Sequence, residues 1–307
     1  MNNEFISVII PNYNHESYLK ERIDSVLGQS YQDYEVIILD DCSTDNSHEV
    51  IERYRDHPKI SHIVYNKVNS GSTFIQWQKG IELAKGEWIW LAESDDVAEP
   101  FFLEKLCAEI ENCKDVVLAY SASNLIDENS NKIGKLDWGY IGARNWENNY
   151  CENGQIEIEN YLFHRNTLPN ASGIIFKKNK IQDETYKIVS SMKYAGDWYF
   201  WVKLLEKGKL CFISEELNNF RQHQQTTRTA KSTKEEIRRF KEYFIVLNYI
   251  HKMYNINWKI SSHQWILDSF MAKFGLNQIF RKPELLKKIP VVYKCYLVKK
   301  LISKRIN

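Results

Sequence analysis

The sequence predicts an α/β protein in which a mostly parallel central sheet is flanked by helices. Short apolar runs alternate along the chain with segments whose apolar residues recur every three or four positions. This alternation is typical of parallel strands joined by crossover helices that cover both faces of the sheet. Apolar residues make up 43% of the 307 residues and charged residues 26%, which is ordinary for a globular protein with one large domain or two.

Five strands are predicted in the first part of the chain, at residues 5–10, 34–39, 60–65, 88–92 and 116–120. Each is a short apolar run, as expected for a strand buried on both faces. Helices are predicted between them from apolar residues at helical spacing, at residues 19–27, 45–54 and 74–84 and after Pro100. Because a helix separates each pair of successive strands, the strands are expected to run parallel.

Acidic residues directly follow two of these strands. Asp40-Asp41 ends the second strand, and Glu93-Ser94-Asp95-Asp96 follows the fourth. Ligands of open α/β sheets bind outside the carboxyl ends of the strands. Carboxylates at that edge can hold a hard cation, which in turn binds phosphate oxygens. The pattern therefore predicts a nucleotide-diphosphate site at one edge of the sheet.

The second part of the chain has weaker periodicity. Residues 129–170 are polar and predict long loops that cover or shape a cleft. A short strand is predicted at 174–176 and a helix at 198–205. Long helices are predicted from Ser232 onward, because Ser232 and Glu235 fit a capping box.

The last 27 residues, 281–307, carry nine Lys or Arg residues and one acid. Val291, Cys295, Val298 and Ile302 lie among them at helical spacing. This combination fits either a helix on an anionic membrane surface or a terminal helix docked on the body with a solvated basic face. No apolar run is long enough to span a membrane and no leader is expected, so the prediction is a cytoplasmic protein, peripheral to the membrane under the first alternative.

Net charge and cysteine spacing limit which partners and metal sites are expected. The formal net charge of +1 gives no indication of a nucleic-acid partner. The cysteines form no CxxC pair and no His/Cys cluster in the sequence, so no zinc site is expected and all six are predicted to be reduced thiols. They are Cys42, Cys107, Cys113, Cys151, Cys211 and Cys295.

Several short motifs occur in a characteristic order. They are Val8-Ile9-Ile10-Pro11-Asn12-Tyr13-Asn14, Asp40-Asp41-Cys42-Ser43-Thr44-Asp45, Asn69-Ser70-Gly71, Glu93-Ser94-Asp95-Asp96, Gly196-Asp197 and Arg221-Gln222-His223. In this order and spacing they resemble the family-two glycosyltransferases, which have the nucleotide-binding GT-A fold. The resemblance covers roughly residues 4–225. It implies a GT-A domain at 1–228, with a nucleotide-sugar part at about 1–125 and an acceptor part at about 126–228. Residues 229–307 then form a helical C-terminal extension.

The resemblance also implies an activity and a set of site residues. The reaction is an inverting transfer of a sugar from a nucleotide-diphosphate donor, usually a UDP-sugar, with Mg²⁺ or Mn²⁺ as cofactor. The acceptor is a hydroxyl of a glycan or lipid-linked glycan, in surface polysaccharide synthesis. The implied nucleotide-binding residues are Pro11, Tyr13, Asn14, Asp41, Asn69, Gly71 and Asp95, with Asp41 accepting from the base; Asp96 and His223 are the implied metal ligands, and Asp197 the catalytic base.

Alternatives remain open at this point. Asp197 precedes a helix, where a carboxylate is most often an N-cap. Glu93 stands where the family often has Asp, and Trp77-Gln78 stands where it often has Arg-Asn. These departures keep open a non-catalytic sugar-nucleotide or glycan binding module on the same fold. A sugar-phosphate nucleotidyltransferase is disfavoured, because the loop at 11–15 is neither glycine-rich nor basic. The oligomeric state is not predicted.

Overall fold

A computed structural model describes residues 5–137, 144–223, 230–274, 286, 287 and 289–306. Its centre is a sheet with the strand order β3-β2-β1-β4-β9-β6-β10-β5, and β7 and β8 pair with β6 and β10 outside this path. The first strands all run parallel: β1 (Ile6–Asn12), β2 (Tyr34–Asp40), β3 (Ile60–Tyr65) and β4 (Trp88–Leu91). The α/β prediction and the GT-A-like parallel core of the sheet are thereby confirmed, with small differences in the strand ends.

The second half of the sheet is mixed. β6 (Val116–Ile126) runs parallel to β10 (Lys209–Arg221), whereas β9 (Ile174–Lys177) runs antiparallel to both β4 and β6. β5 (Val97–Ala98) forms an antiparallel edge on β10. The antiparallel strand β9 therefore joins the parallel strands β1 to β4 to the second half of the sheet.

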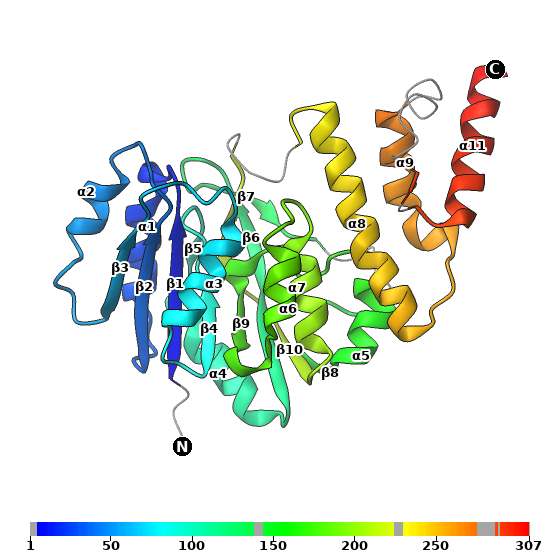
Figure 1. The fold of residues 1–307 in the computed structure, drawn as a ribbon. Coiled ribbons are helices and arrows are strands. Elements are labelled where there is room, and N and C mark those ends of the chain that lie inside the picture. The colour runs from blue at the N-terminus through cyan, green and yellow to red at the C-terminus, as the bar shows by residue number, and fades with distance from the viewer. Residues whose placement is uncertain (1–4, 138–143, 224–229, 275–285, 288, 307) are drawn as a thin grey trace.

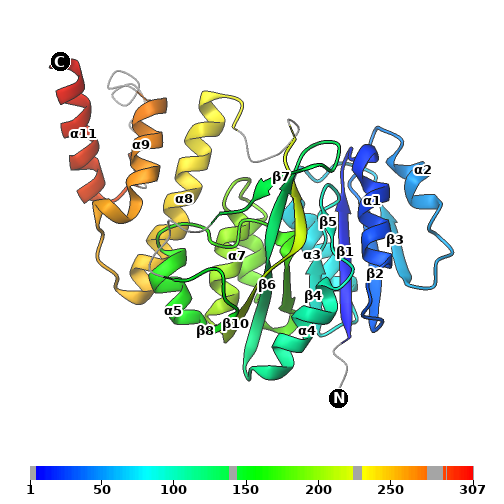
Figure 2. The same ribbon diagram turned by 180° about the vertical axis from the view of Figure 1, so that it is seen from behind.

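Helices cover both faces of the sheet, as Figures 1 and 2 show from opposite sides. One face carries α1 (Glu16–Leu27), α2 (Ser47–Glu52) and α4 (Phe102–Asn112). The other carries α3 (Thr73–Leu83), α6 (Asp183–Val189) and α7 (Gly196–Leu205). The alternation within β1 explains the two cores, because Ile6, Val8 and Ile10 pack into one cluster while Ile9 packs into the other.

The prediction of long loops over residues 129–170 is wrong in part. This region contains β7 (Lys132–Lys135), β8 (Tyr150–Asn153), α5 (Gly154–Glu157) and a π-helical turn at Ile158–Leu162. The 13-residue strand β10 was not predicted either. Both β8 and β10 carry polar residues and are paired with segments distant in the sequence, so their local pattern is weak.

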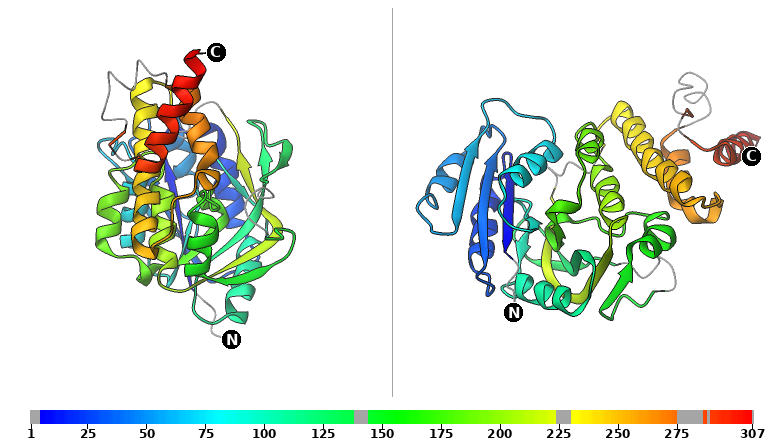
Figure 3. Two further views of the ribbon diagram at one scale, coloured as in Figure 1. Left: turned by 90° about the vertical axis from the view of Figure 1, so that its right-hand side faces the viewer. Right: turned by 60° about the horizontal axis from the view of Figure 1, so that its bottom comes forward.

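The helical C-terminal extension is confirmed, with α8 (Thr233–Tyr254), α9 (Gln264–Lys273) and α11 (Val291–Ile306). The right panel of Figure 3 shows these helices at the end of the molecule away from α2. The Ser232 hydroxyl accepts a hydrogen bond from the Glu235 amide at 3.3 Å, as the capping box predicts. The predicted domain boundary at residue 228 lies outside the described residues, so this division stays a prediction.

Helix α11 is docked on the body through Tyr293 and Leu297, both fully buried. Residues 281–285 and 288 of the predicted basic tail, with the side chains of residues 301–307, lie outside the described part of the chain. Among the helices that the structure describes, none combines the length and the apolar character needed to cross a membrane.

The prediction of six reduced thiols is wrong for two cysteines. Cys151 of β8 and Cys211 of β10 face each other in the antiparallel register and form a disulfide. Their separation of 60 residues hid the pairing, because no local sequence pattern indicates which distant strands become neighbours.

Candidate active site

A cleft of about 530 Å³ opens at the carboxyl ends of the parallel strands. Its lining includes nine of the ten residues predicted for the site: Pro11, Tyr13, Asn14, Asp41, Asn69, Gly71, Asp95, Asp96 and Asp197. The tenth, His223, contacts the cleft residue Asp95. Residues from loops far apart in the sequence therefore meet in one cavity, as the sheet rule requires.

Asp40 holds the loop after β2 rather than facing a ligand. Its carboxylate accepts hydrogen bonds from the Asn12 side chain at 2.8 Å and from the Ser43 amide and hydroxyl at 2.9 and 2.6 Å. This turn allows Cys42 the left-handed backbone at φ 64°. Asp40 thus ties β1 to the β2 loop, and the adjacent residue Asp41 is the one that reaches the cleft.

Asp41 is 5% exposed and surrounded by donors. Its Oδ1 accepts from the Asn66 side chain at 2.6 Å, the Ser70 amide at 2.9 Å and the Gln76 side chain at 2.9 Å. Its Oδ2 accepts from the Ser70 hydroxyl at 2.7 Å. A carboxylate oxygen with one such donor keeps an acceptor position for a ligand N–H. The surrounding donors fix the orientation of Asp41 at the wall of the cleft.

The rim of the nucleotide side is formed by Tyr13 and a turn after β3. The Tyr13 ring is 46% exposed at the cleft, so it offers a face on which a planar base can stack. Asn69 donates to the Asp41 carbonyl at 3.1 Å and accepts from the Gly71 amide at 2.6 Å. Gly71 has φ 73°, a left-handed conformation that favours glycine. Asn14 accepts from the Thr44 amide at 2.7 Å, so it supports the loop besides lining the cleft.

Glu93 and Trp77, the two departures from the family pattern, are bonded to each other. The Trp77 indole donates to Glu93 Oε1 at 2.7 Å. Burial, followed by the charge of Asp95, raises the pKa of Glu93 to about 8 despite this hydrogen bond. The buried Arg22 guanidinium donates to the Glu93 carbonyl at 2.8 Å and so holds the start of the acidic loop.

Asp95 lies in a group with two imidazoles. Its Oδ2 is 2.9 Å from His223 Nε2, and the ligand atoms of His15, Asp95 and His223 all lie within 4.8 Å of one another. Burial favours the neutral acid, but the His223 hydrogen bond and the nearby His15 outweigh it and lower the pKa of Asp95. The two imidazoles therefore favour the ionised form of Asp95.

Asp96 is held against the body of the protein. It is 2% exposed, and its Oδ1 accepts from the Arg221 amide at 2.9 Å. Burial and the charge of Asp95 raise its pKa. The Arg221 side chain reinforces this arrangement by donating to the Asp95 carbonyl at 2.7 Å and pairing with Glu21 at 2.7 Å. The role of Asp96 as a metal ligand stays a prediction, while the geometry offers Asp95 as the carboxylate nearest to the histidines.

Asp197 lies in the first turn of α7 and lines the same cleft. The N-cap alternative is not supported, because the N-cap residue is Ala195. Asp197 Oδ2 accepts from the Asn166 side chain at 3.0 Å. The carboxylate thus has a fixed direction and stays accessible from the cleft, which are two requirements for a general base.

The loop before Asp197 is held by the C-terminal extension. Glu242 of α8 is 4% exposed and accepts from the backbone amides of Lys193, Tyr194 and Ala195, at distances between 2.6 and 3.1 Å. Arg238 donates to the same carboxylate at 2.8 Å. A buried carboxylate with several N–H donors is a strong anchor, so α8 fixes the start of α7 and the position of Asp197.

The sequence interpretation missed His15, Asn166 and Glu242. A weak signal existed for His15, which follows Asn14 in the loop after the first strand. No signal existed for Asn166 or Glu242, because their function arises from contacts over 31 and 47 to 49 residues.

Comparisons with known proteins agree with this geometry. The chain is 32% identical over 269 residues to an uncharacterized glycosyltransferase of Rickettsia typhi, covering 86% of this chain and 78% of the relative. It is 38% identical over 100 residues to the putative teichuronic acid biosynthesis glycosyltransferase TuaG of Bacillus subtilis, covering 33% of this chain and 39% of TuaG. Its fold is similar to that of S. aureus TarS 1–349 in complex with UDP-GlcNAc, with a TM-score of 0.67 at 17% identity, covering 97% and 88% of the two chains.

The profile of Glycosyl transferase family 2 matches residues 7–172, which is more than half of the chain. The match spans the loops that carry Asp41 and Asp95, and the structural similarity extends over the rest of the domain. The family resemblance and the GT-A fold predicted from the motifs are confirmed. The chain therefore belongs to glycosyl transferase family 2 and is a glycosyltransferase with a GT-A fold.

Proposed function

We propose that this glycosyltransferase moves a sugar from a UDP-sugar to a hydroxyl of a cell-surface glycan, with inversion at the anomeric carbon. The observation that carries the proposal is the position of Asp197, which lies in the same cleft as Asp41 and Asp95 but comes from a helix instead of a strand-end loop. Inverting transfer is a single displacement, so the acceptor must approach from the side opposite the leaving diphosphate. One base on the acceptor side and one anion-binding site on the donor side meet this requirement.

Asp197 would accept the proton of the acceptor hydroxyl as the new glycosidic bond forms. A positioned general base typically contributes about 10²–10⁴-fold to the rate. Asn166 donates to Oδ2 of this carboxylate and so fixes its orientation in the cleft. Because no covalent intermediate is needed, a second carboxylate nucleophile is not required in the cleft.

One group of side chains in the site could bind a divalent metal ion. His15, Asp95 and His223 would hold it, and within the described residues Nδ1 of His223 is buried without a hydrogen-bond partner. When bound, such an ion would neutralise charge on the leaving diphosphate. Mg²⁺ prefers sites of oxygen ligands, whereas imidazole ligands favour transition metals. Of the two predicted ions, these three ligands therefore favour Mn²⁺.

Uridine and a surface glycan are supported by different features. Tyr13 offers a stacking face and Asp41 an oriented acceptor for a base N–H. S. aureus TarS, of similar fold, was crystallised with UDP-GlcNAc and with UDP. The relative TuaG is named for teichuronic acid biosynthesis. These support a UDP-sugar donor and a polysaccharide acceptor.

The face of α11 that points away from the body supports a lipid-linked acceptor. Tyr293 and Leu297 dock the helix, whereas Val291 is 70% exposed and Cys295 is also exposed. Lys299 and Lys300 are exposed beside this outer face. In Figure 1, α11 ends on the side of the molecule toward which β1 points, where the cleft opens. A basic helix with an outer apolar face on that side suits contact with anionic lipid.

Vesicle sedimentation tests the membrane part. The full chain should sediment with vesicles that contain anionic phosphatidylglycerol and remain in solution with neutral phosphatidylcholine vesicles. Lys299→Glu with Lys300→Glu should abolish sedimentation, whereas the matched pair Lys177→Glu with Lys180→Glu, on the body, should not. Equal sedimentation of both double variants would refute this part while leaving sugar transfer intact.

Donor binding and turnover test the main proposal. A thermal-shift screen of nucleotide sugars with and without Mn²⁺ should show stabilisation by a UDP-sugar, because a ligand at about 100 times its Kd adds about 2.7 kcal/mol. A non-catalytic binding module would show the same shift and no product with any acceptor. Stabilisation only by nucleotides other than uridine would refute the UDP assignment.

A further inference from the structure

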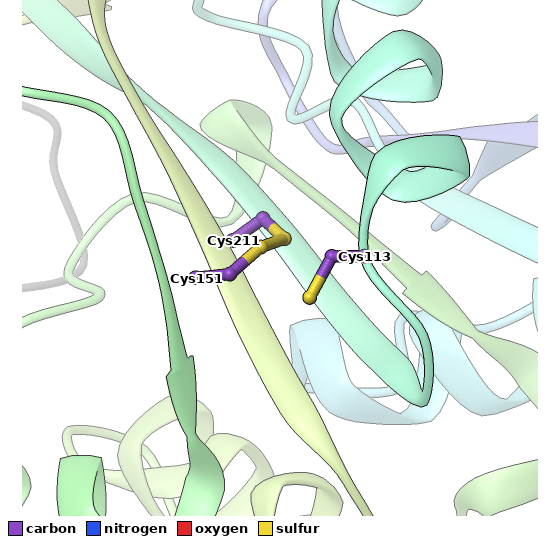
Figure 4. A group of neighbouring side chains, drawn as sticks. All are labelled: Cys113, Cys151 and Cys211. Carbon is purple, nitrogen blue, oxygen red and sulfur yellow. A yellow bond between two sulfur atoms is a disulfide. The ribbon is translucent and has the colours of Figure 1, made fainter.

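A third cysteine lies beside the Cys151–Cys211 disulfide, as Figure 4 shows. The sulfur atoms of Cys113, Cys151 and Cys211 all lie within 4.8 Å of one another. They come from the end of α4, from β8 and from β10, and the last turn of α4 packs on Cys211, whose sulfur is 3.9 Å from the Glu109 carbonyl oxygen. From these contacts we infer that the three cysteines form a thiol–disulfide exchange site in which Cys113 moves the cross-link from β8 to α4.

The exchange needs no external oxidant. The Cys113 thiol loses its proton to solvent, and the thiolate attacks Sγ of Cys211. The Cys113–Cys211 bond forms, the Cys151–Cys211 bond breaks, and Cys151 leaves as a thiolate that takes up a proton. The number of disulfides and the oxidation state of the protein are unchanged.

The direction of attack follows from exposure. Cys151 is exposed, Cys113 is half-buried and Cys211 is fully buried. A thiolate is stabilised by water, so the exposed Cys151 is the favoured leaving group and Cys211 the sulfur that stays bonded. The sulfur of Cys113 already lies within 4.8 Å of both sulfurs of the disulfide, so the attacking group is close to its target. The product exposes a free Cys151 thiol to small thiols such as glutathione.

The position of the disulfide gives the exchange a structural effect. Cys151 and Cys211 close a loop of the chain that contains Asn166 and Asp197. In the exchanged form β8 is held to β10 by its ladder alone, while α4 becomes linked to β10. The cross-link at the two ends of the acceptor-side segment is thus the one that the exchange removes.

Disulfide mapping of the full chain tests the site. The protein is prepared without reductant, held at about pH 6 or about pH 8.5, labelled with N-ethylmaleimide and digested without reduction. Near the higher pH about half of an ordinary thiol is ionised. A Cys113–Cys211 peptide should appear there, and Cys151 should become labelled. In Cys113→Ser, Cys151 should stay unlabelled and the unfolding midpoint should stay close to that of the parent chain.

A second variant tests the pairing directly. In Cys151→Ser, oxidised glutathione should convert Cys113 and Cys211 into an internal disulfide, with release of two reduced glutathione molecules. The matched control Cys295→Ser removes a different exposed cysteine. After oxidised glutathione it should give the same pairing of Cys113, Cys151 and Cys211 as the parent chain.

Three results would overturn the inference. One is a single Cys151–Cys211 linkage with only Cys113 labelled at both pH values. Another is persistence of both thiols in Cys151→Ser after oxidised glutathione. The third is a stoichiometric zinc ion that protects all three cysteines from labelling in the protein as isolated, which would make the cluster a metal site.

Discussion

The side of the cleft that we propose for the donor and the side that we propose for the acceptor are built in different ways. On the donor side, Asp41 and Asp95 extend from loops directly after parallel strands, and most of their partners lie in neighbouring loops. On the acceptor side, Asp197 depends on Asn166 for its direction and on Glu242 of α8 for the position of its helix. The donor side is thus organised by strand ends, and the acceptor side by contacts from separate elements.

This difference indicates which parts of the cleft can vary in sequence while the proposed transfer reaction is kept. The loops after the parallel strands carry the residues proposed to bind the nucleotide diphosphate, and the paired strands position these loops. The side of the cleft proposed for the acceptor is lined by residues 169–171, residues 192–194 and Asp197 of α7, and α8 holds the loop at 193–195. Changes in these elements can reshape the acceptor wall while the donor site is kept.

The largest effect on catalysis is expected from a substitution of Asp197, which should change the rate of transfer but not the binding of the donor. Asp197→Asn should lower kcat by about 10²–10⁴-fold, because the acceptor proton loses its base. Donor affinity should remain within a few-fold, since Asp197 is not on the nucleotide wall. Steady-state kinetics together with thermal shift by the donor measure both quantities.

The control for this prediction is Asp95→Asn, on the donor side. It should weaken the donor-induced thermal shift in the presence of Mn²⁺, because it removes the carboxylate beside His15 and His223. If Asp197→Asn instead lost donor binding and kept its kcat, the division of labour between the two walls would be wrong.

The same division explains what could be predicted from the sequence. The parallel strands are short apolar runs buried on both faces, so their pattern is strong and their loops can be located to within a few residues. Strands β8 and β10 alternate poorly and pair with distant segments, and neither was predicted. The Cys151–Cys211 pair was missed for the same reason, because register between distant strands is a tertiary property.

The residues of the candidate site divide in the same way into those that could be predicted from the sequence and those that could not. The predicted residues of the strand-end loops all line the cleft, as does Asp197. The groups that orient them were not predictable, since Asn166 and Glu242 have no motif and their effect depends on the docking of α7 and α8. Family motifs therefore located the residues that we propose to react, whereas long-range packing determined the groups that position them.

The docking of the C-terminal helices should depend on pH. His263 is fully buried between the Phe163 carbonyl and the Tyr293 hydroxyl, and burial, despite the Phe163 hydrogen bond, lowers its pKa to about 4. Above the unfolded pKa of about 6.5 the ring is neutral in both states. As the pH falls from 6.5 toward 4, only the unfolded state gains the proton, so this group should lower the free energy of unfolding by up to about 3 kcal/mol.

Urea unfolding at several pH values measures this effect. The slope of stability between pH 6.5 and 4 should be reduced in His263→Gln, which has no ring to protonate. The exposed His48 offers no such burial, so His48→Gln should leave the slope unchanged. Equal slopes in all three proteins would show that acid sensitivity comes from elsewhere.

A substitution in α8 should have a smaller effect on kcat, because α8 holds the loop before Asp197. Glu242→Gln places an amide against the backbone donors of residues 193–195 and should lower stability by about 1–3 kcal/mol. Because these residues precede Asp197, kcat should also fall while the KM for the donor changes little. Lys252→Gln, at an exposed position further along the same helix, should keep kcat. A loss of stability with unchanged kcat well below the unfolding midpoint would reduce Glu242 to a purely structural role.

The smallest effect is expected at the turn beside Asp41. Gly71 has φ 73°, and the space around its Cα is open, with the nearest heavy atom to an added Cβ 4.0 Å away. Alanine there should cost about 1 kcal/mol through the backbone rather than through a clash. Gly71→Ala should weaken donor binding modestly and leave acceptor kinetics unchanged, whereas Gly71→Asn should lose less, because Asn tolerates the left-handed region. Equal losses in the two variants would mean that the ligand needs the space at Gly71, so the donor wall would be limited by contact as well as by backbone geometry.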